Sequence, residues 1–582
     1  MFYELKKKIE EWFKSDNFGI FIILLFFLIF SLMIIARLYN LQIVKGDGYR
    51  GKVIKSSERL LKNKTFDRGK IYFRDNEGLI PVAVQKNGYY ISIDNINNKF
   101  IDNNNPEDVF KKIKTIITDL DKEYFLSKSK KGFWRDLKYR ISLEDAKKIK
   151  KLKINGLFVM RQSWREYPLG NTGGKIIGYI DIDKKGVNGL EKYYDKELFR
   201  TIRKNKKNIF LDIFSKDTDD FFEKKSVVRE GDLYTTIDVN IQMFLENKLK
   251  EISKKYSSKD SLGIIIKPSS GEIIAMADDN ALDFNKQKKD YRNKIVESRY
   301  EPGSIIKPLI VSMGLDSKSI NTNFSYNDKG CMVVQGYKVC NYDKKSRGDN
   351  VGLVEIIKKS LNLGMVTIQK IIKKSVFLDY FLKLGLSEES GIDLPGEVSP
   401  NISSLNYKID INYATAAFGQ GISSSPISML RSLSVIANDG FLVNPHIMKE
   451  INYGENIPSK IFEIEKEKVL KTETIENIKN IMVQAVNQSE LKQKFQRRGY
   501  SVAAKTGTAQ VAAKGGGYKE DKNIHAFFGF FPVTAKPEDR YAVILYTFEP
   551  RAKYSSETLT KPFYDILDYL ISYYDIKPDK IK

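Results

Sequence analysis

The chain has 582 residues, too many for one hydrophobic core, so we expect two or more domains. Hydrophobic residues make up 42% and aromatic residues 12% of the sequence, which excludes a generally disordered chain. The formal net charge of +24 would suit an anionic partner, but lysines on solvated surfaces explain it more simply. We expect no nucleic-acid partner, because neither zinc-finger spacing nor an aromatic RNA-binding strand motif occurs.

The first predicted element is a membrane anchor. Residues 19–36 carry no charged side chain, and a spanning helix needs roughly 17 to 25 such residues. A cleaved signal peptide is the alternative, but its apolar part would be about 7 to 15 residues long and end at a small-residue cleavage site. We therefore predict a cytoplasmic tail over 1–18 and a single uncleaved transmembrane helix over 19–37. Basic residues flank both ends almost equally, so charge sets the orientation only weakly.

A non-catalytic region follows over 38–235. It contains short β-like runs and basic stretches, without a nucleotide-binding loop or a metal-ligand cluster. We predict a β-rich domain here.

A second domain is predicted over 236–575, with a short tail over 576–582. Asp238 is a suitable N-cap, and the apolar residues that follow it are spaced three and four apart, as in a helix. A second helix is expected at about 557–574, and a largely helical segment at about 300–440. Five β-like runs complete the domain, at 262–266, 272–276, 502–511, 525–531 and 541–548. We predict an α+β fold in which the first and last helices cover one face of a five-stranded antiparallel sheet.

The two cysteines, Cys331 and Cys340, fit neither a redox motif nor a metal quartet. The residues between them are typical of a hairpin that turns at Gln335-Gly336. This register places Cys331 opposite Cys340 as a non-hydrogen-bonded pair, whose Cα separation of about 4.5 Å suits a disulfide. We expect a disulfide, with two buried thiols as the alternative.

Histidine is scarce, with only His446 and His525 in the chain. A zinc site is therefore not expected, and a Ser-His-Asp triad would need one of these two residues. Any nucleophilic serine is expected to use lysine as its base.

Three short motifs with catalytic character occur in order, namely Ser304-x-x-Lys307, Ser360-x-Asn362 and Lys505-Thr506-Gly507. The first two types also occur elsewhere by chance, for example at Ser489-x-x-Lys492, whereas Lys-Thr-Gly occurs once.

Ser304 opens an apolar run that is typical of a helix, and residues three apart on a helix share a face. The Lys307 amine can then reach the Ser304 hydroxyl. Lys307 can act as a base only if burial and a nearby cation, for which Lys505 is the candidate, lower its pKa. The alternative is a surface helix that carries serine and lysine by chance.

Ser360 and Asn362 are expected within a helix over 352–372. Their hydroxyl and amide are suited to relaying a proton and holding a substrate amide. A polar helix face is the alternative.

The third motif is expected on a strand. Lys505, Thr506 and Thr508 are suited to binding a carboxylate, and Gly507 permits close approach of a substrate backbone. The backbone N–H groups of Ser304 and Thr508 are candidates for an oxyanion hole. An ordinary edge strand is the alternative, but it explains neither the glycine nor the threonines.

These motifs, in the forms YEPGS-x-x-K, S-x-N and KTGTAQ, resemble the catalytic motifs of class B penicillin-binding proteins. The resemblance extends over about residues 37–570. It departs from the family pattern at 73–78, where the usual Asp-Arg-Asn-Gly is disrupted. The other matching stretches lie at 68–71, 165–168, 178–179, 189–195, 391–397, 418–422 and 526–532.

The resemblance implies that Ser304 is the acylated nucleophile and Lys307 its base, assisted by Ser360 and Asn362. Its implied substrate is a peptidoglycan stem peptide ending in D-Ala-D-Ala, and β-lactams would be trapped as acyl-enzymes. No cofactor or metal is implied.

The resemblance also implies an elongated pedestal over 38–235 and a catalytic domain on the outer side of the bacterial cytoplasmic membrane. The implied partners are a multi-spanning glycosyltransferase and other division proteins. Residues 300–303, 549–550 and 554–556 favour the division (septal) branch, and the elongation branch is the alternative. A β-lactam sensor or hydrolase on the same fold and an inert scaffold are the other classes, and the intact motif triplet argues against a scaffold.

Overall fold

The computed structural model describes two compact units. The first unit has the bounds 1–66, 89–161 and 202–207, and the second has the bounds 67–88, 162–201 and 208–582. The residues that the structure describes are Glu4 and 16–39, 68–94, 100–130, 134–199, 231–280, 282, 291–454, 457–489, 499–512 and 517–580.

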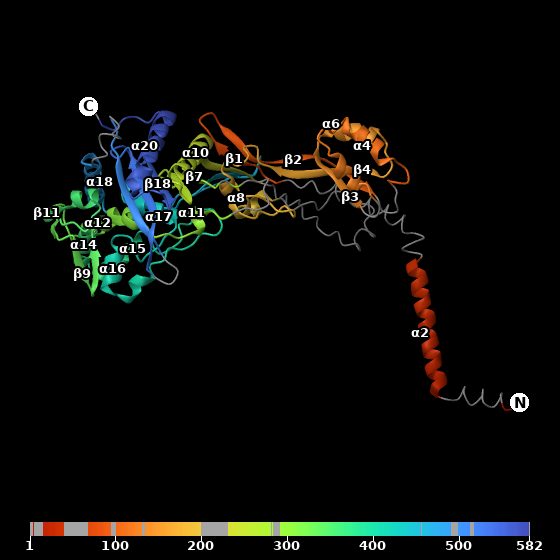
Figure 1. The fold of residues 1–582 in the computed structure, drawn as a ribbon, viewed down its shortest axis with the longest axis horizontal. Helices are drawn as coiled ribbons and strands as arrows, with labels where there is room; N and C mark the ends of the chain where they lie inside the picture. The colour runs from red at the N-terminus through yellow and green to blue at the C-terminus, as the bar shows by residue number, and fades with distance from the viewer. Residues whose placement is uncertain are drawn as a thin grey trace. The chain divides into compact units, whose positions relative to one another are not determined.

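The apolar run near the N-terminus forms helix α2 (Asp16–Tyr39), drawn in red in Figure 1. Its described side chains, from Phe26 to Tyr39, are all exposed. Among the described residues, no helix is found that is long and apolar enough to cross a bilayer. The transmembrane anchor therefore stays a prediction.

The first unit contains strands and helices around one small core. Residues 89–94 of β2 (Leu79–Asp94) pair antiparallel with β3 (Trp134–Ile141). Three helices that the sequence analysis did not foresee pack here, each beginning after an Asn, Asp or Ser side chain that caps its first turn. They are α4 (Pro106–Lys114), α5 (Lys122–Lys128) and α6 (Leu143–Lys151). The region is thus less purely β than we expected.

The second unit begins with segments from the region predicted as non-catalytic. Strand β1 (Ile71–Arg74) pairs parallel with β5 (Asp232–Asp238), and β5 pairs antiparallel with β13 (Met448–Asn452). The compact units therefore do not follow the contiguous division at residue 235, because β1 and β5 belong to one sheet. Three short helices lie in the same unit, α7 (Gly174–Ile177), α8 (Gly189–Tyr193) and α9 (Asp195–Leu198).

The predicted five-stranded antiparallel sheet is confirmed. Its strand order is β16-β17-β18-β6-β7. The strands are β6 (Asp260–Ile266), β7 (Ile273–Asp278), β16 (Ala503–Ala512), β17 (Tyr518–Phe531) and β18 (Tyr541–Phe548). Because β16 lies at one end of this order, one of its edges has no partner strand within the described part of the chain.

Two helices cover one face of this sheet, as predicted (Figure 1). They are α10 (Val239–Tyr256) and α20 (Ser555–Tyr574). The Asp238 side chain accepts hydrogen bonds from the backbone N–H groups of Asn240 and Ile241, so it caps α10 as expected.

The opposite face of the sheet lies against the helical segment. The central helices, α12 (Lys307–Asp316) and α17 (Pro426–Ala437), are buried along their whole lengths. The remaining elements are α11 (Lys294–Glu297), η3 (Gly303–Ile306), β8 (Ser325–Asp328), β9 (Cys331–Val334), β10 (Tyr337–Cys340), β11 (Gly348–Gly352), α13 (Leu353–Lys358), α14 (Asn362–Ile371), α15 (Lys374–Lys383), η4 (Ser403–Tyr407), α16 (Asp410–Ala416), β12 (Phe441–Val443), β14 (Lys460–Ile461), β15 (Lys466–Lys468) and α18 (Thr472–Asn487).

Candidate active site

Ser304 lies on a 3-10 turn that continues into a buried helix. Turn η3 ends at Ile306, and Lys307 is the first residue of α12. Residues three apart on a 3-10 turn are nearly eclipsed, so Ser304 and Lys307 share one face. Ser304 is half-buried, whereas the isoleucines after it are fully buried. The turn therefore holds the hydroxyl at the edge of the core.

The Lys307 amine is fully buried and has three hydrogen-bond partners. Its Nζ lies 2.6 Å from the Ser360 carbonyl oxygen, 2.8 Å from Asn362 Oδ1 and 3.2 Å from Ser360 Oγ. Burial, and then the neighbouring Lys505 cation, hold the pKa of Lys307 well below its ordinary 10.5.

The arrangement around Lys307 suits a neutral amine. A neutral amine has two hydrogens and one lone pair. The carbonyl oxygens of Ser360 and Asn362 can only accept, so they take both hydrogens. The lone pair is then free to accept from a hydroxyl, as a base must.

Ser360 lies between two helices. The prediction of one continuous helix over 352–372 is therefore wrong, because the helix is interrupted around Ser360. Helix α13 ends at Lys358 and α14 begins at Asn362. Ser360 has a φ of +55°, a left-handed conformation that breaks the helical run. For a residue other than glycine this conformation costs about 1–3 kcal/mol. It turns the Ser360 carbonyl toward Lys307, whose hydrogen bond stabilises it.

Lys505 reaches Ser360 from the edge strand β16. Its amine donates to Ser360 Oγ at 3.0 Å and to the Thr506 carbonyl oxygen at 2.7 Å. The side chain is 4% exposed, and burial lowers its pKa to about 7. The Ser360 hydroxyl therefore lies between two buried amines, where it can pass a proton from one side to the other.

Gly507 has a packing role that the sequence did not reveal. A Cβ at this position would lie 3.0 Å from Ile305 Cγ2 and 3.2 Å from the Ile305 nitrogen. The turn that carries Ser304 thus packs directly on β16, and only glycine fits there without a shift. The predicted close approach of a substrate backbone stays a prediction.

The two expected oxyanion-hole segments are neighbours. A Cβ on Gly303, the residue before Ser304, would lie 3.5 Å from the Thr508 carbonyl oxygen and 3.1 Å from Ala509 Cβ. The backbone N–H groups of Ser304 and Thr508 therefore belong to adjacent segments. This proximity is what a two-donor anion site requires.

Two hydrogen bonds that hold the turn carrying Ser304 were not predicted from the sequence. The Gly303 N–H donates to the Gly419 carbonyl at 3.0 Å, and the Glu301 carboxylate accepts from the Gly421 N–H at 2.9 Å. Both glycines belong to the stretch 418–422, which matches the family pattern. Its glycine spacing was the available signal.

The histidines lie outside this arrangement. His525 Nδ1 contacts Thr558 Oγ1 at 2.9 Å, and burial lowers the pKa of His525 to about 4. His446 stacks on Phe462 with ring centroids 3.7 Å apart. Lysine is thus the base that the geometry offers to Ser304. Within the described ranges, no group of His, Cys, Asp and Glu side chains is placed to hold a metal ion.

Strands β9 and β10 form the predicted hairpin, with Cys331 opposite Cys340. The structure joins the two cysteines in a disulfide, with Cα atoms 4.0 Å apart. The Cys340 carbonyl accepts a hydrogen bond from Asn362 Nδ2 at 3.0 Å. The hairpin is therefore in direct contact with the second motif.

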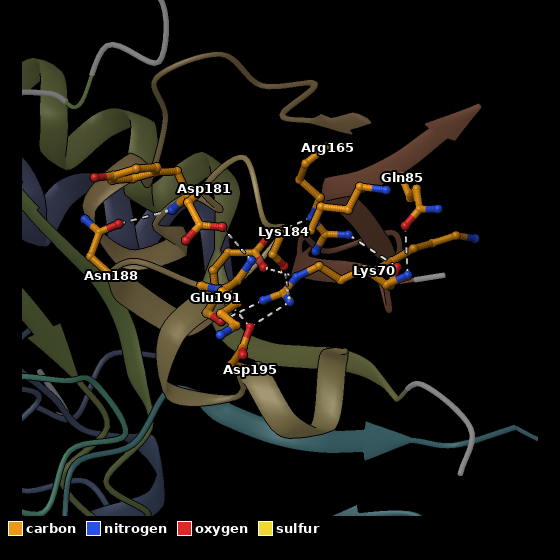
Figure 2. Close-up of polar contacts among 12 residues, drawn as sticks. Lys70, Gln85, Arg165, Asp181, Lys184, Asn188, Glu191 and Asp195 are labelled. Atoms are coloured by element: carbon orange, nitrogen blue, oxygen red, sulfur yellow. Dashed lines mark hydrogen bonds and ion pairs between the residues drawn. The ribbon is translucent and has the colours of Figure 1, made fainter. Parts of the chain in front are cut away.

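Three of the stretches that match the family pattern, 68–71, 165–168 and 189–195, meet in a buried ionic cluster (Figure 2). Both carboxylate oxygens of Glu191 are engaged, one by Arg68 Nε at 2.5 Å and the other by Arg165 Nε at 2.7 Å. Asp195 accepts from Arg68 at 2.8 Å, and the nearby Tyr194 hydroxyl donates to Asp393 at 2.7 Å. These contacts join stretches far apart in the sequence.

Comparison with known proteins agrees with this organisation. The family model "Penicillin binding protein transpeptidase domain" matches residues 262–568, and "Penicillin-binding Protein dimerisation domain" matches residues 64–208.

Curated relatives are similar over most of the chain. "Stage V sporulation protein D" of Bacillus subtilis is 31% identical over 404 residues, which is 68% of this chain and 62% of that protein. "Peptidoglycan D,D-transpeptidase FtsI" of Buchnera aphidicola subsp. Schizaphis graminum is 26% identical over 566 residues, 95% of this chain and 94% of that protein. The FtsI protein of Escherichia coli K12 is 24% identical, covering 78% of this chain and 74% of its own length.

Solved structures show the same fold. Penicillin Binding Protein 2X from Streptococcus thermophilus gives a TM-score of 0.69 at 20% identity, covering 88% of this chain and 81% of its own. A peptidoglycan synthetase from Bifidobacterium adolescentis gives 0.67 at 21% identity, covering 89% and 97%. Because the transpeptidase model alone matches more than half of the chain and a dimerisation domain precedes it, this chain belongs to the class B penicillin-binding proteins.

Proposed function

We propose that this protein is a peptidoglycan D,D-transpeptidase that forms peptide cross-links through an acyl-enzyme on Ser304. The observation that carries the proposal is the Lys307 amine, which is buried, is bonded only to neutral oxygens and lies one 3-10 turn from Ser304. The family match and the relatives named peptidoglycan D,D-transpeptidase support it.

In the first half-reaction, Ser304 Oγ attacks the carbonyl carbon of the penultimate D-alanine while its proton passes to Lys307 Nζ. The backbone N–H groups of Ser304 and Thr508 stabilise the oxyanion. The peptide bond then breaks, and the Ser360 hydroxyl relays the proton to the amine of the leaving D-alanine. The product is an ester between Ser304 and the shortened stem.

In the second half-reaction, an amine from a neighbouring stem attacks this ester. A new peptide bond forms, the Ser304–acyl bond breaks, and the proton released by the amine returns to Ser304 through Lys307. The protein ends unchanged, and one cross-link has replaced one D-Ala-D-Ala bond.

Lys505, Thr506, Gly507 and Thr508 provide the substrate-binding strand in this proposal. A protonated Lys505 attracts the terminal carboxylate, and the hydroxyls of the threonines offer hydrogen bonds to it. An extended stem peptide can add to the free edge of β16 by backbone pairing.

The cellular role in the proposal is septal wall synthesis. The relatives named FtsI and the stretch 300–303 favour this division role over the elongation role. Nascent stem peptides are the substrates, a multi-spanning glycosyltransferase supplies the glycan strands, and other division proteins bind the same assembly. A fluorescent fusion concentrated at division sites supports this role, and a uniform distribution along the cell wall contradicts it.

The proposed location is the bacterial cytoplasmic membrane, with α2 as a single-pass anchor and the catalytic domain outside. The uncharged stretch 19–36 within α2 and the Cys331–Cys340 disulfide support this topology, because disulfides persist in oxidising compartments. Protease added to intact spheroplasts should digest the catalytic domain, and complete protection of that domain would contradict the topology.

The test of the activity is acylation of the full-length protein by a fluorescent penicillin. We expect one stable label per chain, which the Ser304→Ala variant loses completely. Ser489→Ala is the matched control, because Ser489 belongs to the chance Ser-x-x-Lys match and should label normally. Rapid release of hydrolysed drug would indicate a hydrolase, and folded protein that takes up no label would indicate a scaffold.

A further inference from the structure

We propose that the disulfide-closed hairpin β9–β10 is a positioning element that orients Asn362 and, through it, the Lys307 amine. The inference deepens the proposed function and rests on it, since it assumes that Lys307 activates Ser304.

Asn362 is held at both ends of its amide. Its Nδ2 donates to the Cys340 carbonyl at 3.0 Å, and its Oδ1 accepts from Lys307 Nζ at 2.8 Å. A flipped amide would turn its two hydrogens toward the hydrogens of the amine and its oxygen toward the Cys340 carbonyl. The Cys340 carbonyl therefore selects the orientation that supports Lys307.

The residue after Cys340 holds the same helix end. The Asn341 side-chain oxygen accepts from the Leu363 N–H at 3.2 Å, which fills one of the open donors in the first turn of α14. The Asn341 amide in turn donates to both carboxylate oxygens of the buried Asp328, at 2.9 and 3.0 Å. The last residue of the hairpin and the residue after it thus fix the start of α14, where Asn362 lies.

The hairpin is small, and of its side chains only Val334 and Val339 are buried. It is a two-stranded sheet with four residues in each strand, and such a hairpin alone is marginally stable. Two of its side chains, Val333 and Tyr337, are 66% and 64% exposed. The disulfide closes the end next to the Cys340 carbonyl, so it fixes the acceptor that Asn362 needs.

The test compares the acylation rate constant of the full-length protein with the disulfide intact, reduced and removed. Dithiothreitol supplies two electrons and two protons, opens the bond to two thiols and ends as its own cyclic disulfide. We expect the rate with a fluorescent penicillin to fall about tenfold, the size of one lost hydrogen bond, and to recover on reoxidation. The Cys331→Ser/Cys340→Ser variant should show the same fall and no response to dithiothreitol. Val333→Ala, on the same hairpin, is the control and should react at the original rate.

A double-mutant cycle distinguishes a disulfide that orients Asn362 from one that only makes the domain more rigid. The Asn362→Ala variant is expected to be acylated slowly, so its rate constant is measured over long incubations. Loss of the disulfide in this variant should not lower the acylation rate constant further. A full additional fall would overturn the proposal, as would equal rates before and after reduction, or a fall accompanied by loss of the native circular dichroism. If the oxidised protein is not labelled at Ser304 at all, the proposed function fails instead.

Discussion

The second unit buries two pairs of cations and compensates them differently. In the N-terminal cluster, one carboxylate, that of Glu191, lies between Arg68 and Arg165. In the candidate active site, the atom between Lys307 and Lys505 is the neutral Ser360 hydroxyl. The counter-charge, more than burial itself, therefore separates a structural site from a reactive one.

The chemistry of the side chains explains the difference. A guanidinium stays protonated in proteins, so buried arginines need a carboxylate. A buried ammonium can release its proton instead. No carboxylate forms an ion pair with Lys307 or Lys505 within the described part of the chain, and both pKa values are lowered by burial. The first pair therefore holds the fold, and the second is available for proton transfer.

The largest expected effect comes from Lys307→Met, which keeps the length of the side chain and removes the amine. General-base assistance is typically worth about 10²- to 10⁴-fold, so we expect acylation by penicillin to slow by about a thousandfold. The protein should still fold, but we expect a lower melting temperature, because the Ser360 carbonyl and Asn362 Oδ1 lose their donor. Stopped-flow fluorescence and a thermal melt measure the two effects.

Lys175→Met is the matched control, because Lys175 is a buried lysine that does have a counter-charge, from Asp278 at 2.6 Å. This variant should melt at a lower temperature and acylate at the original rate. Equal loss of acylation in Lys175→Met and Lys307→Met would contradict the special role of the uncompensated lysine.

Glu191→Gln tests the structural pair. The substitution leaves Arg68 with Asp195 as its counter-charge and leaves Arg165 facing a neutral amide, and such an uncompensated buried charge costs about 3–5 kcal/mol. We expect a clearly lower melting temperature, with normal acylation of the protein that remains folded. Asp195→Asn should lower the melting temperature less, because the Asp195 side chain is 30% exposed. Equal melting of Glu191→Gln and the original protein would contradict the structural role.

Tyr194→Phe gives the smallest effect. The hydroxyl donates to Asp393, which also accepts from the backbone N–H groups of Ile447 and Met448. Losing one of three such bonds should lower the free energy of unfolding by about 1 kcal/mol and leave acylation unchanged. Denaturant titration measures it, and a loss larger than that of Glu191→Gln would reverse the expected ranking.

Local patterns were sufficient for much of the fold. The cap at Asp238, the helix that follows it and the register of Cys331 opposite Cys340 depend on near neighbours in the sequence. The helices α4–α6 were not predicted because each has only seven to nine residues, too few for a helical repeat to be clear.

Long-range packing explains the other differences. The left-handed Ser360 depends on a lysine 53 residues away in the chain. Likewise, Gly507 is needed because the turn at Ile305 packs against it, and no local pattern in the sequence could indicate that contact. The motifs predicted which residues meet, while the charge state of Lys307 required knowledge of its burial.

The pH dependence of the second-order acylation rate constant tests the central claim most directly, because it reports the charge states of the free protein. A base is active above its pKa, so a strongly lowered Lys307 pKa predicts a rate that rises at a pH well below the ordinary lysine value. Lys505 loses its proton above about pH 7, and with it the attraction for the drug's carboxylate, so the rate should fall again. We expect a bell-shaped profile with its maximum near neutral pH. A rate that climbs steadily toward the ordinary lysine value of 10.5 would show that Lys307 is charged at neutral pH and would contradict the account.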